Sequence, residues 1–445
     1  MNSQETQLHV PAEAVHSTLK KHMLVDGFDL VLDLEKSMGS TIYDKRFNRR
    51  FVDFFTFFAS NPIGFNHPRI SHDEEFKSKL LKVALVKPSN SDVYTEEMAE
   101  FVSTFSRVGI PEHLPHLFII DGGTLAVENA LKVAFDWKVR KNFEKGHKSE
   151  KGHQIIHFKQ AFHGRSGYCL SITNTLSDKT DYFPKFPWPR ITNPMLHFPL
   201  TEAGLAETAR LEAQAYDEIH LAIKQNPDDI AAIIIEPIQA EGGDHHLSKT
   251  FLKKLRQICD ENEILLIFDE VQTGFGITGK FWAHEHFVEP DILAFGKKAQ
   301  VCGVLAGKRI DEVKDNVFNK SSRINSTWGS NLVDMVRVTR FLEIMEEEHL
   351  VDYSASTGNI LLRKIQGLAQ EFEGIVTNPR GLGLMCAFDL DSRESRNKFV
   401  NLCYENGLLI LGCGEKTVRF RPALNIPEAT LSEGIEIIQK VLRKM

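Results

Sequence analysis

Five short runs of continuous apolar residues, separated by helical stretches, lie between Pro115 and Gly307 and constrain the fold more than any other feature. They are HLFIID at 116–121, QIIHF at 154–158, AAIIIEPI at 231–238, ILLIFDEV at 264–271 and DILAFGK at 291–297. Strands without polar alternation are buried on both faces, as in parallel α/β sheets. The pattern therefore predicts an α/β fold in which helices sandwich a mostly parallel sheet.

Two helices between these strands are visible from their periodicity. Residues 124–143 place Leu131, Ala134 and Phe135 at helical spacing directly after a glycine pair, so a tight turn leads from a strand into a helix. Phe251, with two apolar residues further along, marks one face of a second helix before the strand that ends at Asp269.

The pattern changes after about Ser330. Amphipathic segments are expected at 332–348, 355–372, 394–406 and 430–443, with short strands near 383–390 and 416–421. We therefore predict a small α+β domain over residues 331–445 and a large domain over 76–330. The first 75 residues contain too little apolar sequence for an independent core, and they are expected to join the small domain.

Composition excludes some functional classes. The net charge is -7 and the basic residues form no long run, so nothing indicates a nucleic-acid surface. No apolar run is long enough to cross a membrane, and the N-terminus lacks the apolar centre of a secretory signal. The six cysteines are scattered, without CxxC pairs or metal-ligand spacing. We expect a cytoplasmic protein without a metal site.

Two charged residues follow neighbouring apolar runs. Asp269 ends ILLIFD, and Lys297 comes directly after DILAFG. Ligands of open α/β sheets bind beyond the carboxyl ends of the strands, so both side chains can reach one crevice. A carboxylate that pairs with a pyridine nitrogen and a lysine that forms a Schiff base are what pyridoxal phosphate (PLP) requires. The alternative is a chance Asp and Lys in a nucleotide-binding sheet.

The turn DGGT at 121–124 is a candidate phosphate site. It places two glycines and a hydroxyl at the start of a helix, where free N–H groups and the helix dipole attract an anion. Glycine pairs also occur in tight turns for steric reasons alone, so this signal is weak by itself.

Taken together, the motifs resemble the class III aminotransferases of PLP-dependent fold type I over nearly the whole chain. The carrying segments are FHGRSGY (162–168), EPIQAEGG (236–243), FDEVQTGFGITGKFWAHE (268–285), PDILAFGKK (290–298), INSTWGSN (324–331) and VRFRPAL (418–424). Within this class, DGGTLAVENALK, FGKKAQVCG and NSTWG look most similar to the lysine 6-aminotransferase group. The resemblance implies fold type I of the PLP-dependent transferases, with a mostly parallel sheet of seven strands.

The resemblance also implies a set of cofactor contacts. The residues that match cofactor positions are Gly123, Thr124, Phe162, Asp269, Gln272, Lys297 and Thr327. Lys297 matches the catalytic Schiff-base lysine and Asp269 the catalytic partner of the pyridinium, while Lys298 is interpreted as a structural neighbour. Thr327 matches a phosphate ligand that reaches across from a second subunit, which implies a homodimer with active sites at the interface. Two departures are the GGT turn, where many members have Ser-Gly, and Cys302 in the glycine-rich stretch.

Four residues match substrate-binding positions. They are Arg165, Glu241, Asn325 and Arg419. Guanidinium groups bind carboxylates through a planar fork, so the two arginines are candidates for the carboxylates of the substrates. Glu241 is expected to pair with Arg419 when a terminal amine reacts, because an unpaired buried charge is costly. Arg421 is expected to be structural. A surface or interdomain ion pair is the alternative for each arginine, and a solvated loop carboxylate is the alternative for Glu241.

The predicted function is therefore transfer of the terminal amino group of L-lysine to 2-oxoglutarate, giving 2-aminoadipate 6-semialdehyde and glutamate. The nearest alternative is an ornithine or 4-aminobutyrate aminotransferase, which would share the cofactor contacts. A PLP mutase or racemase of the same fold is an alternative from another reaction class.

Overall fold

The computed structural model describes residues 9–445, and residues 1–8 of the predicted N-terminal segment lie outside it. The helices are α1 (Val15–Leu19), α2 (Thr56–Ala59), α3 (Pro68–Ser71), α4 (Glu74–Ala84), α5 (Glu96–Val108), α6 (Gly123–Glu144), α7 (Gly167–Ile172), α8 (Glu202–Gln225), α9 (Lys249–Glu261), α10 (Leu332–Glu347), α11 (Leu350–Glu371), α12 (Arg393–Glu405) and α13 (Glu428–Leu442). The strands are β1 (Thr41–Asp44), β2 (Arg49–Asp53), β3 (His116–Ile120), β4 (Gln154–Phe158), β5 (Arg190–Ile191), β6 (Ile230–Ile235), β7 (Ile238–Gln239), β8 (His245–His246), β9 (Leu265–Asp269), β10 (Ile292–Phe295), β11 (Cys302–Ala306), β12 (Thr377–Leu382), β13 (Met385–Asp389), β14 (Leu408–Leu409), β15 (Leu411–Cys413) and β16 (Thr417–Phe420). No helix in this described part is long and apolar enough to cross a membrane.

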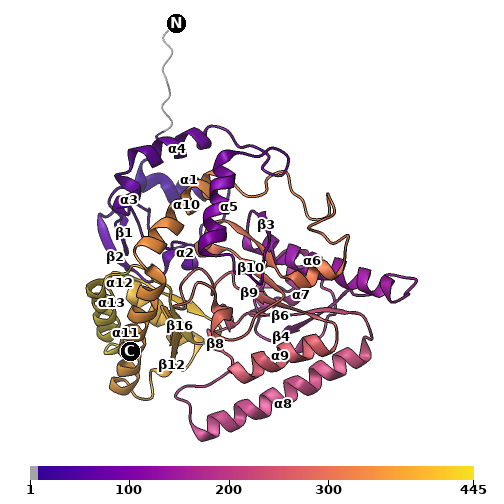
Figure 1. The fold of residues 1–445 in the computed structure, drawn as a ribbon. Helices are drawn as coiled ribbons and strands as arrows, with labels where there is room; N and C mark the ends of the chain where they lie inside the picture. The colour runs from indigo at the N-terminus through magenta and orange to yellow at the C-terminus, as the bar shows by residue number, and fades with distance from the viewer. Residues whose placement is uncertain (1–8) are drawn as a thin grey trace.

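A mostly parallel sheet forms the centre of the molecule (Figure 1). Its order is β3-β11-β10-β9-β6-β4-β5, a seven-stranded sheet within residues 9–445. Strands β10, β9, β6, β4 and β5 run parallel to one another. Strand β11 is antiparallel to both β10 and β3. The five predicted strands are all present, so the fold prediction is confirmed.

Helices cover both faces of this sheet, which explains the continuous apolar runs. Along β6, Ile234 packs in one core cluster with α6, whereas Ile233 and Ile235 pack in another with α8 and α9. Strand β9 repeats the pattern, because Ile267 lies in the first cluster and Phe268 in the second. Neither face of these strands meets water, so no alternation of polar residues is needed.

The C-terminal part has its own small sheet. Its order is β12-β13-β16-β15, with antiparallel pairing throughout. Helices α11 and α13 pack together, and α12 packs against α13 and β16. The four predicted amphipathic segments are observed as α10 to α13, and the two predicted strands as β13 and β16.

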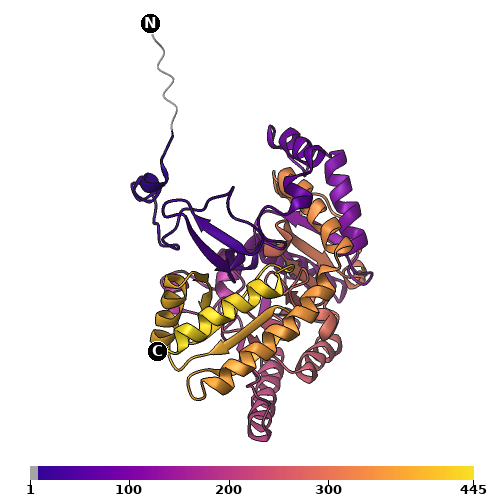
Figure 2. The same cartoon turned by 90° about the vertical axis from the view of Figure 1, so that its left-hand side faces the viewer.

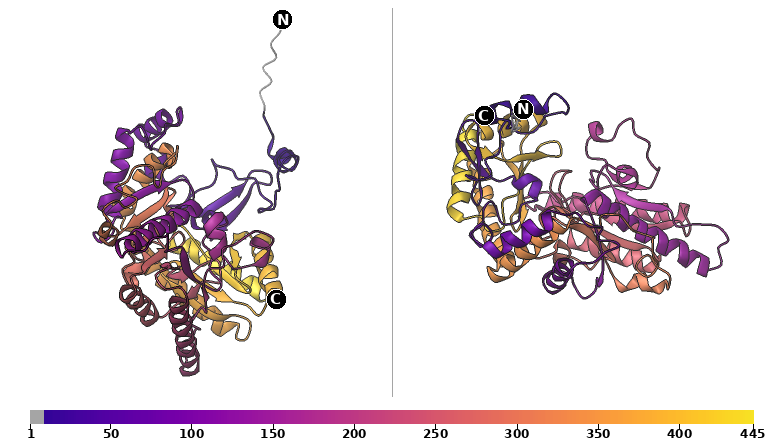
Figure 3. Two further views of the ribbon diagram at one scale, coloured as in Figure 1. Left: turned by 90° about the vertical axis from the view of Figure 1, so that its right-hand side faces the viewer. Right: turned by 90° about the horizontal axis from the view of Figure 1, so that it is seen from above.

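The N-terminal segment lies against this C-terminal part. Strand β2 pairs with β1 on one side and in parallel with β14 on the other, although β2 and β14 are far apart in the sequence. Figures 2 and 3 show the indigo N-terminal strands beside the yellow C-terminal elements. Helix α10, in contrast, packs against α4 and α5. The division of the chain at residues 75 and 330 stays a prediction.

Candidate active site

The carboxyl ends of two adjacent parallel strands bring Asp269 and Lys297 to one cavity. Asp269 ends β9, and Lys297 begins the short 3₁₀ helix η4 (Lys297–Ala299) directly after β10. Both line a cavity of ≈ 170 Å³. The lining consists of Gly123, Thr124, Val127, Phe162, His163, Gly164, Glu236, Asp269, Val271, Gln272 and Lys297. All predicted cofactor residues except Thr327 therefore surround one space.

Asp269 is buried and held in a fixed orientation. One carboxylate oxygen, Oδ2, lies 2.8 Å from Nδ1 of His163. The other, Oδ1, accepts a hydrogen bond from the backbone N–H of Val271 at 3.1 Å. His163 was not predicted as a site residue, although it lies within the FHGR motif. A carboxylate oriented in this way can pair with a cationic ring nitrogen.

Lys297, and not Lys298, faces this cavity. The ammonium of Lys298 instead donates to the carbonyl oxygens of Asn61 and Pro422, at 3.4 and 3.3 Å. Lys297 has φ of +48°, in the left-handed region that residues with a Cβ seldom adopt. Burial, followed by the charge of Arg419, lowers the pKa of Lys297 to about 8. A neutral amine, which is the nucleophilic and basic form, is therefore accessible near neutral pH.

The N-terminus of α6 forms another wall of the cavity. Gly122 has φ of +93°, and no side chain caps the helix. An added Cβ at Gly164 would lie 2.5 Å from Oγ1 of Thr124, so only glycine lets this loop approach the helix so closely. Uncapped N–H groups and the helix dipole favour an anion here. Gly123 and Thr124 thus form a wall that fits a phosphate group.

The side chain of Gln272 lacks a partner in the described chain. Its Oε1 is buried and accepts no hydrogen bond within residues 9–445. A ligand hydroxyl would satisfy this oxygen. Phe162, which also lines the cavity, is fixed by its backbone N–H, which donates to Oε1 of Glu236 at 3.0 Å. Burial raises the pKa of Glu236 to about 7. Glu236 is a second lining residue that sequence reasoning missed.

Glu241 and Arg419 form the predicted ion pair. Arg419 is only 2% exposed, and its Nη2 lies 2.9 Å from Oε2 of Glu241. The Nε and Nη1 atoms of Arg419 have no hydrogen-bond partner within the described chain. The other carboxylate oxygen, Oε1 of Glu241, accepts from the ammonium of Lys179, which was not predicted. Burial alone would raise the pKa of Glu241, but the charges of Arg419 and Lys179 hold it below its usual value.

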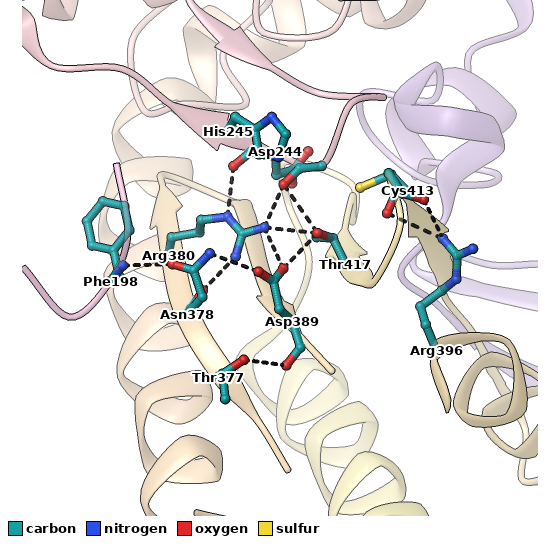
Figure 4. A network of polar contacts seen from close by, with 12 residues as sticks. Phe198, Asp244, His245, Thr377, Asn378, Arg380, Asp389, Arg396, Cys413 and Thr417 are labelled. Carbon is teal, nitrogen blue, oxygen red and sulfur yellow. Dashed lines mark hydrogen bonds and ion pairs between the residues drawn. The ribbon is translucent and has the colours of Figure 1, made fainter. Parts of the chain in front are cut away.

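A buried polar network fixes the loop that carries Glu241 (Figure 4). Arg380 donates through Nε to the carbonyl oxygen of Asp244 at 2.8 Å, and through Nη2 to Asp389 at 2.8 Å. Asp244 in turn accepts two hydrogen bonds from Arg421, at 2.5 and 2.9 Å. Arg421 therefore has the structural role that was expected. The network ties this loop to β12, β13 and the end of β16.

Five predicted site residues do not line this cavity. Glu241 lines a separate cavity of ≈ 440 Å³, and Arg419 is buried and paired with Glu241. Arg165, Asn325 and Thr327 are exposed, and none of them contributes to the lining. Asn325 and Thr327 belong to the segment that leads into α10. One chain alone does not bring these side chains to the cofactor residues, so their roles stay predictions.

A family model described as Aminotransferase class-III matches residues 25–442. The chain belongs to the class III aminotransferases. It is 49% identical to L-lysine-epsilon aminotransferase of Mycobacterium tuberculosis H37Rv over 97% of this chain and 95% of that protein. It is 47% identical to the Streptomyces clavuligerus enzyme of that name, over 96% and 93%. A solved structure of lysine aminotransferase from M. tuberculosis in the internal aldimine form superimposes with a TM-score of 0.96 and 49% identity, covering 98% of this chain and 100% of that one.

Membership of this class implies PLP as the cofactor and fold type I as the architecture, and the cavity fits that cofactor. The uncapped α6 N-terminus could hold a phosphate, Asp269 lines the space and could accept from a ring N–H, and the unpartnered Gln272 oxygen could accept from a hydroxyl. Lys297 supplies the amine. The residues missed by sequence reasoning, His163, Glu236 and Lys179, act on other site residues. They are recognised only from the structure, as residues that contact the predicted ones.

Proposed function

We propose that this aminotransferase transfers the terminal amino group of L-lysine to 2-oxoglutarate, giving 2-aminoadipate 6-semialdehyde and L-glutamate. The observation that carries the proposal is the ion pair between Glu241 and Arg419 close to Lys297, since the charge of Arg419 contributes to the lowered pKa of that lysine. A site for a terminal amine has no carboxylate beside the reacting carbon, and Glu241 supplies the missing negative charge. The lysine enzymes at 47–49% identity support the same donor.

The residues of the cavity divide the chemistry among them. When bound, PLP supplies an aldehyde that takes up the amino group and a protonated ring that delocalises negative charge. Asp269 would hold the ring nitrogen of the bound cofactor in its protonated form. Nζ of Lys297 removes a proton from the carbon that carries the reacting amine, and its lowered pKa suits this task. Phe162, in the cavity wall, would pack against the ring of the bound cofactor and exclude water from it.

Arg419 and Glu241 let one site accept two different substrates in turn. While lysine reacts, Glu241 neutralises Arg419. When 2-oxoglutarate enters, its 1-carboxylate lies beside the keto carbon and takes the place of Glu241 on Arg419, whose free Nε and Nη1 groups are available to bind it. Arg165, exposed in the single chain, receives the 5-carboxylate.

The exposed positions of Asn325 and Thr327 support a homodimer. In a dimer, Thr327 reaches the phosphate in the partner's cavity, and Asn325 reaches the substrate there. We place the enzyme in the cytoplasm, because its six cysteines are free and five of them are buried, as in proteins of reducing compartments.

The alternatives differ in what they require of Glu241. An ornithine or 4-aminobutyrate aminotransferase also accepts a terminal amine, and it differs in the length of the donor. A mutase or racemase needs no 2-oxoglutarate and no exchange of Arg419 between Glu241 and a substrate carboxylate. The ion pair therefore favours a terminal-amine aminotransferase over that second class.

Replacing Glu241 with alanine should have opposite effects on the two amino donors. Arg419 then stays free for an α-carboxylate, so kcat/KM for glutamate should rise about threefold, while that for lysine falls roughly tenfold. Rapid mixing of the holoenzyme with each donor separately measures the two half-reactions. Glu415→Ala removes an exposed carboxylate that pairs with Arg393 instead, and it should change neither. A parallel fall for both donors would leave Glu241 a structural residue.

A further inference from the structure

Glu241 is bound by two cations from different parts of the fold. Arg419 comes from β16 and is buried, whereas Lys179 ends the short 3₁₀ helix η2 (Ser177–Lys179) that follows α7. Each cation contacts a different carboxylate oxygen. The side chains of Lys179 and Glu241 are 25% and 19% exposed, against 2% for Arg419. The carboxylate therefore connects a buried guanidinium with an ammonium nearer the solvent.

The ammonium of Lys179 also has a second fixed neighbour. Its Nζ lies 5.4 Å from the centroid of the Phe162 ring, within the range of a cation–π contact. Phe162 is itself anchored by the hydrogen bond from its backbone to Glu236. Lys179 is thus held between Phe162, in the wall of the cofactor cavity, and Glu241.

The balance of charge shows what this second cation does. Arg419 and Glu241 together are neutral, and Lys179 makes the group of three carry one net positive charge. If a substrate carboxylate took Arg419 without Lys179 present, Glu241 would be left partly buried, unpaired and close to a like charge. With Lys179 present, Glu241 keeps one cationic partner after it leaves Arg419. The three residues and the bound substrate carboxylate together then carry no net charge.

We infer that Lys179 is a positioning residue that retains Glu241 when a substrate carboxylate occupies Arg419. The inference deepens, and rests on, the proposed exchange at Arg419. Lys179 stabilises Glu241 after this carboxylate has left Arg419. It therefore favours the half-reaction with 2-oxoglutarate or glutamate. It has no such part in the half-reaction with lysine, during which Glu241 stays on Arg419.

Binding of glutarate, an unreactive five-carbon diacid, to the holoenzyme tests this role without turnover. Calorimetry should show about fivefold weaker binding for Lys179→Met, because one partly exposed charged contact is lost. Lys179→Arg keeps the charge and should stay within about twofold of the wild type. Lys148→Met, which removes an exposed lysine on another loop, should bind like the wild type. Thermal melting of each variant checks that it is folded.

The decisive comparison is made in a Glu241→Ala background. If Lys179 acts by retaining Glu241, adding Lys179→Met there should weaken glutarate binding by less than about twofold. An equal loss in both backgrounds would mean that Lys179 binds the ligand itself, and the inference would be overturned. Unchanged or tighter binding in Lys179→Met alone, or no glutarate binding to the wild type, would overturn it as well.

Kinetics separate this inference from the proposed donor. Lys179→Met should slow the half-reaction with glutamate about fivefold and leave the half-reaction with lysine within about twofold. A wild-type enzyme that does not react with lysine would refute the donor assignment, whereas the glutarate measurements would still decide the role of Lys179. Equal slowing of both half-reactions would show that Lys179 merely supports the fold.

Discussion

Replacing Lys297 with alanine is expected to lower turnover by at least about 10³-fold, because the covalent attachment point and the proton carrier are lost together. Among the lysines within residues 9–445, this one alone lines the cavity, directly after the end of β10. Borohydride reduction followed by intact-mass measurement should add the cofactor to the wild-type chain and not to the variant.

The neighbouring lysine provides the matched control. Lys298→Met also removes a buried amine, but one that donates to two carbonyl oxygens away from the cavity. This variant should still attach the cofactor after reduction. Retained attachment and turnover in Lys297→Ala, together with their loss in Lys298→Met, would show that the two lysines have been assigned the wrong way round.

Replacing Asp269 with asparagine should cost about 10²- to 10³-fold in the rate of each half-reaction, because an amide does not hold the ring nitrogen in its charged form. The amide keeps nearly the same shape and remains in reach of His163, so the variant should still bind the cofactor. Cofactor content from the absorption spectrum, and single-turnover rates from rapid mixing, separate binding from chemistry. An unchanged single-turnover rate would contradict the assigned role.

Local sequence patterns were enough to predict the strands of the central sheet and the position of the crevice at their ends. Because β6 and β9 are buried on both faces, their sequences are unbroken apolar runs. Parallel strands also bring their carboxyl ends to the same edge of the sheet. Asp269 and Lys297 could therefore be placed in one crevice from their positions in the sequence alone. The antiparallel strand β11 escaped prediction, because its short apolar run after Lys297 does not reveal the direction of the strand.

Long-range polar contacts were harder to predict. The pair of Glu241 and Arg419 was expected only through the family resemblance, because the two residues are far apart in the sequence. The contact of Lys179 with Glu241 joins two loops and has no periodic signal. The predicted roles of Asn325 and Thr327 rest on the family resemblance alone, because neither side chain lines the cavity.

The most direct test of the central claim follows the transferred nitrogen. Purified holoenzyme is incubated with 2-oxoglutarate and L-lysine that carries ¹⁵N only at the ε-amine, and the glutamate is analysed by mass spectrometry. The glutamate formed should carry ¹⁵N, and its amount should equal that of the semialdehyde. Unlabelled glutamate would show that the α-amine reacts instead, and no glutamate from lysine, with rapid formation from ornithine or 4-aminobutyrate, would contradict the assignment of lysine as the donor.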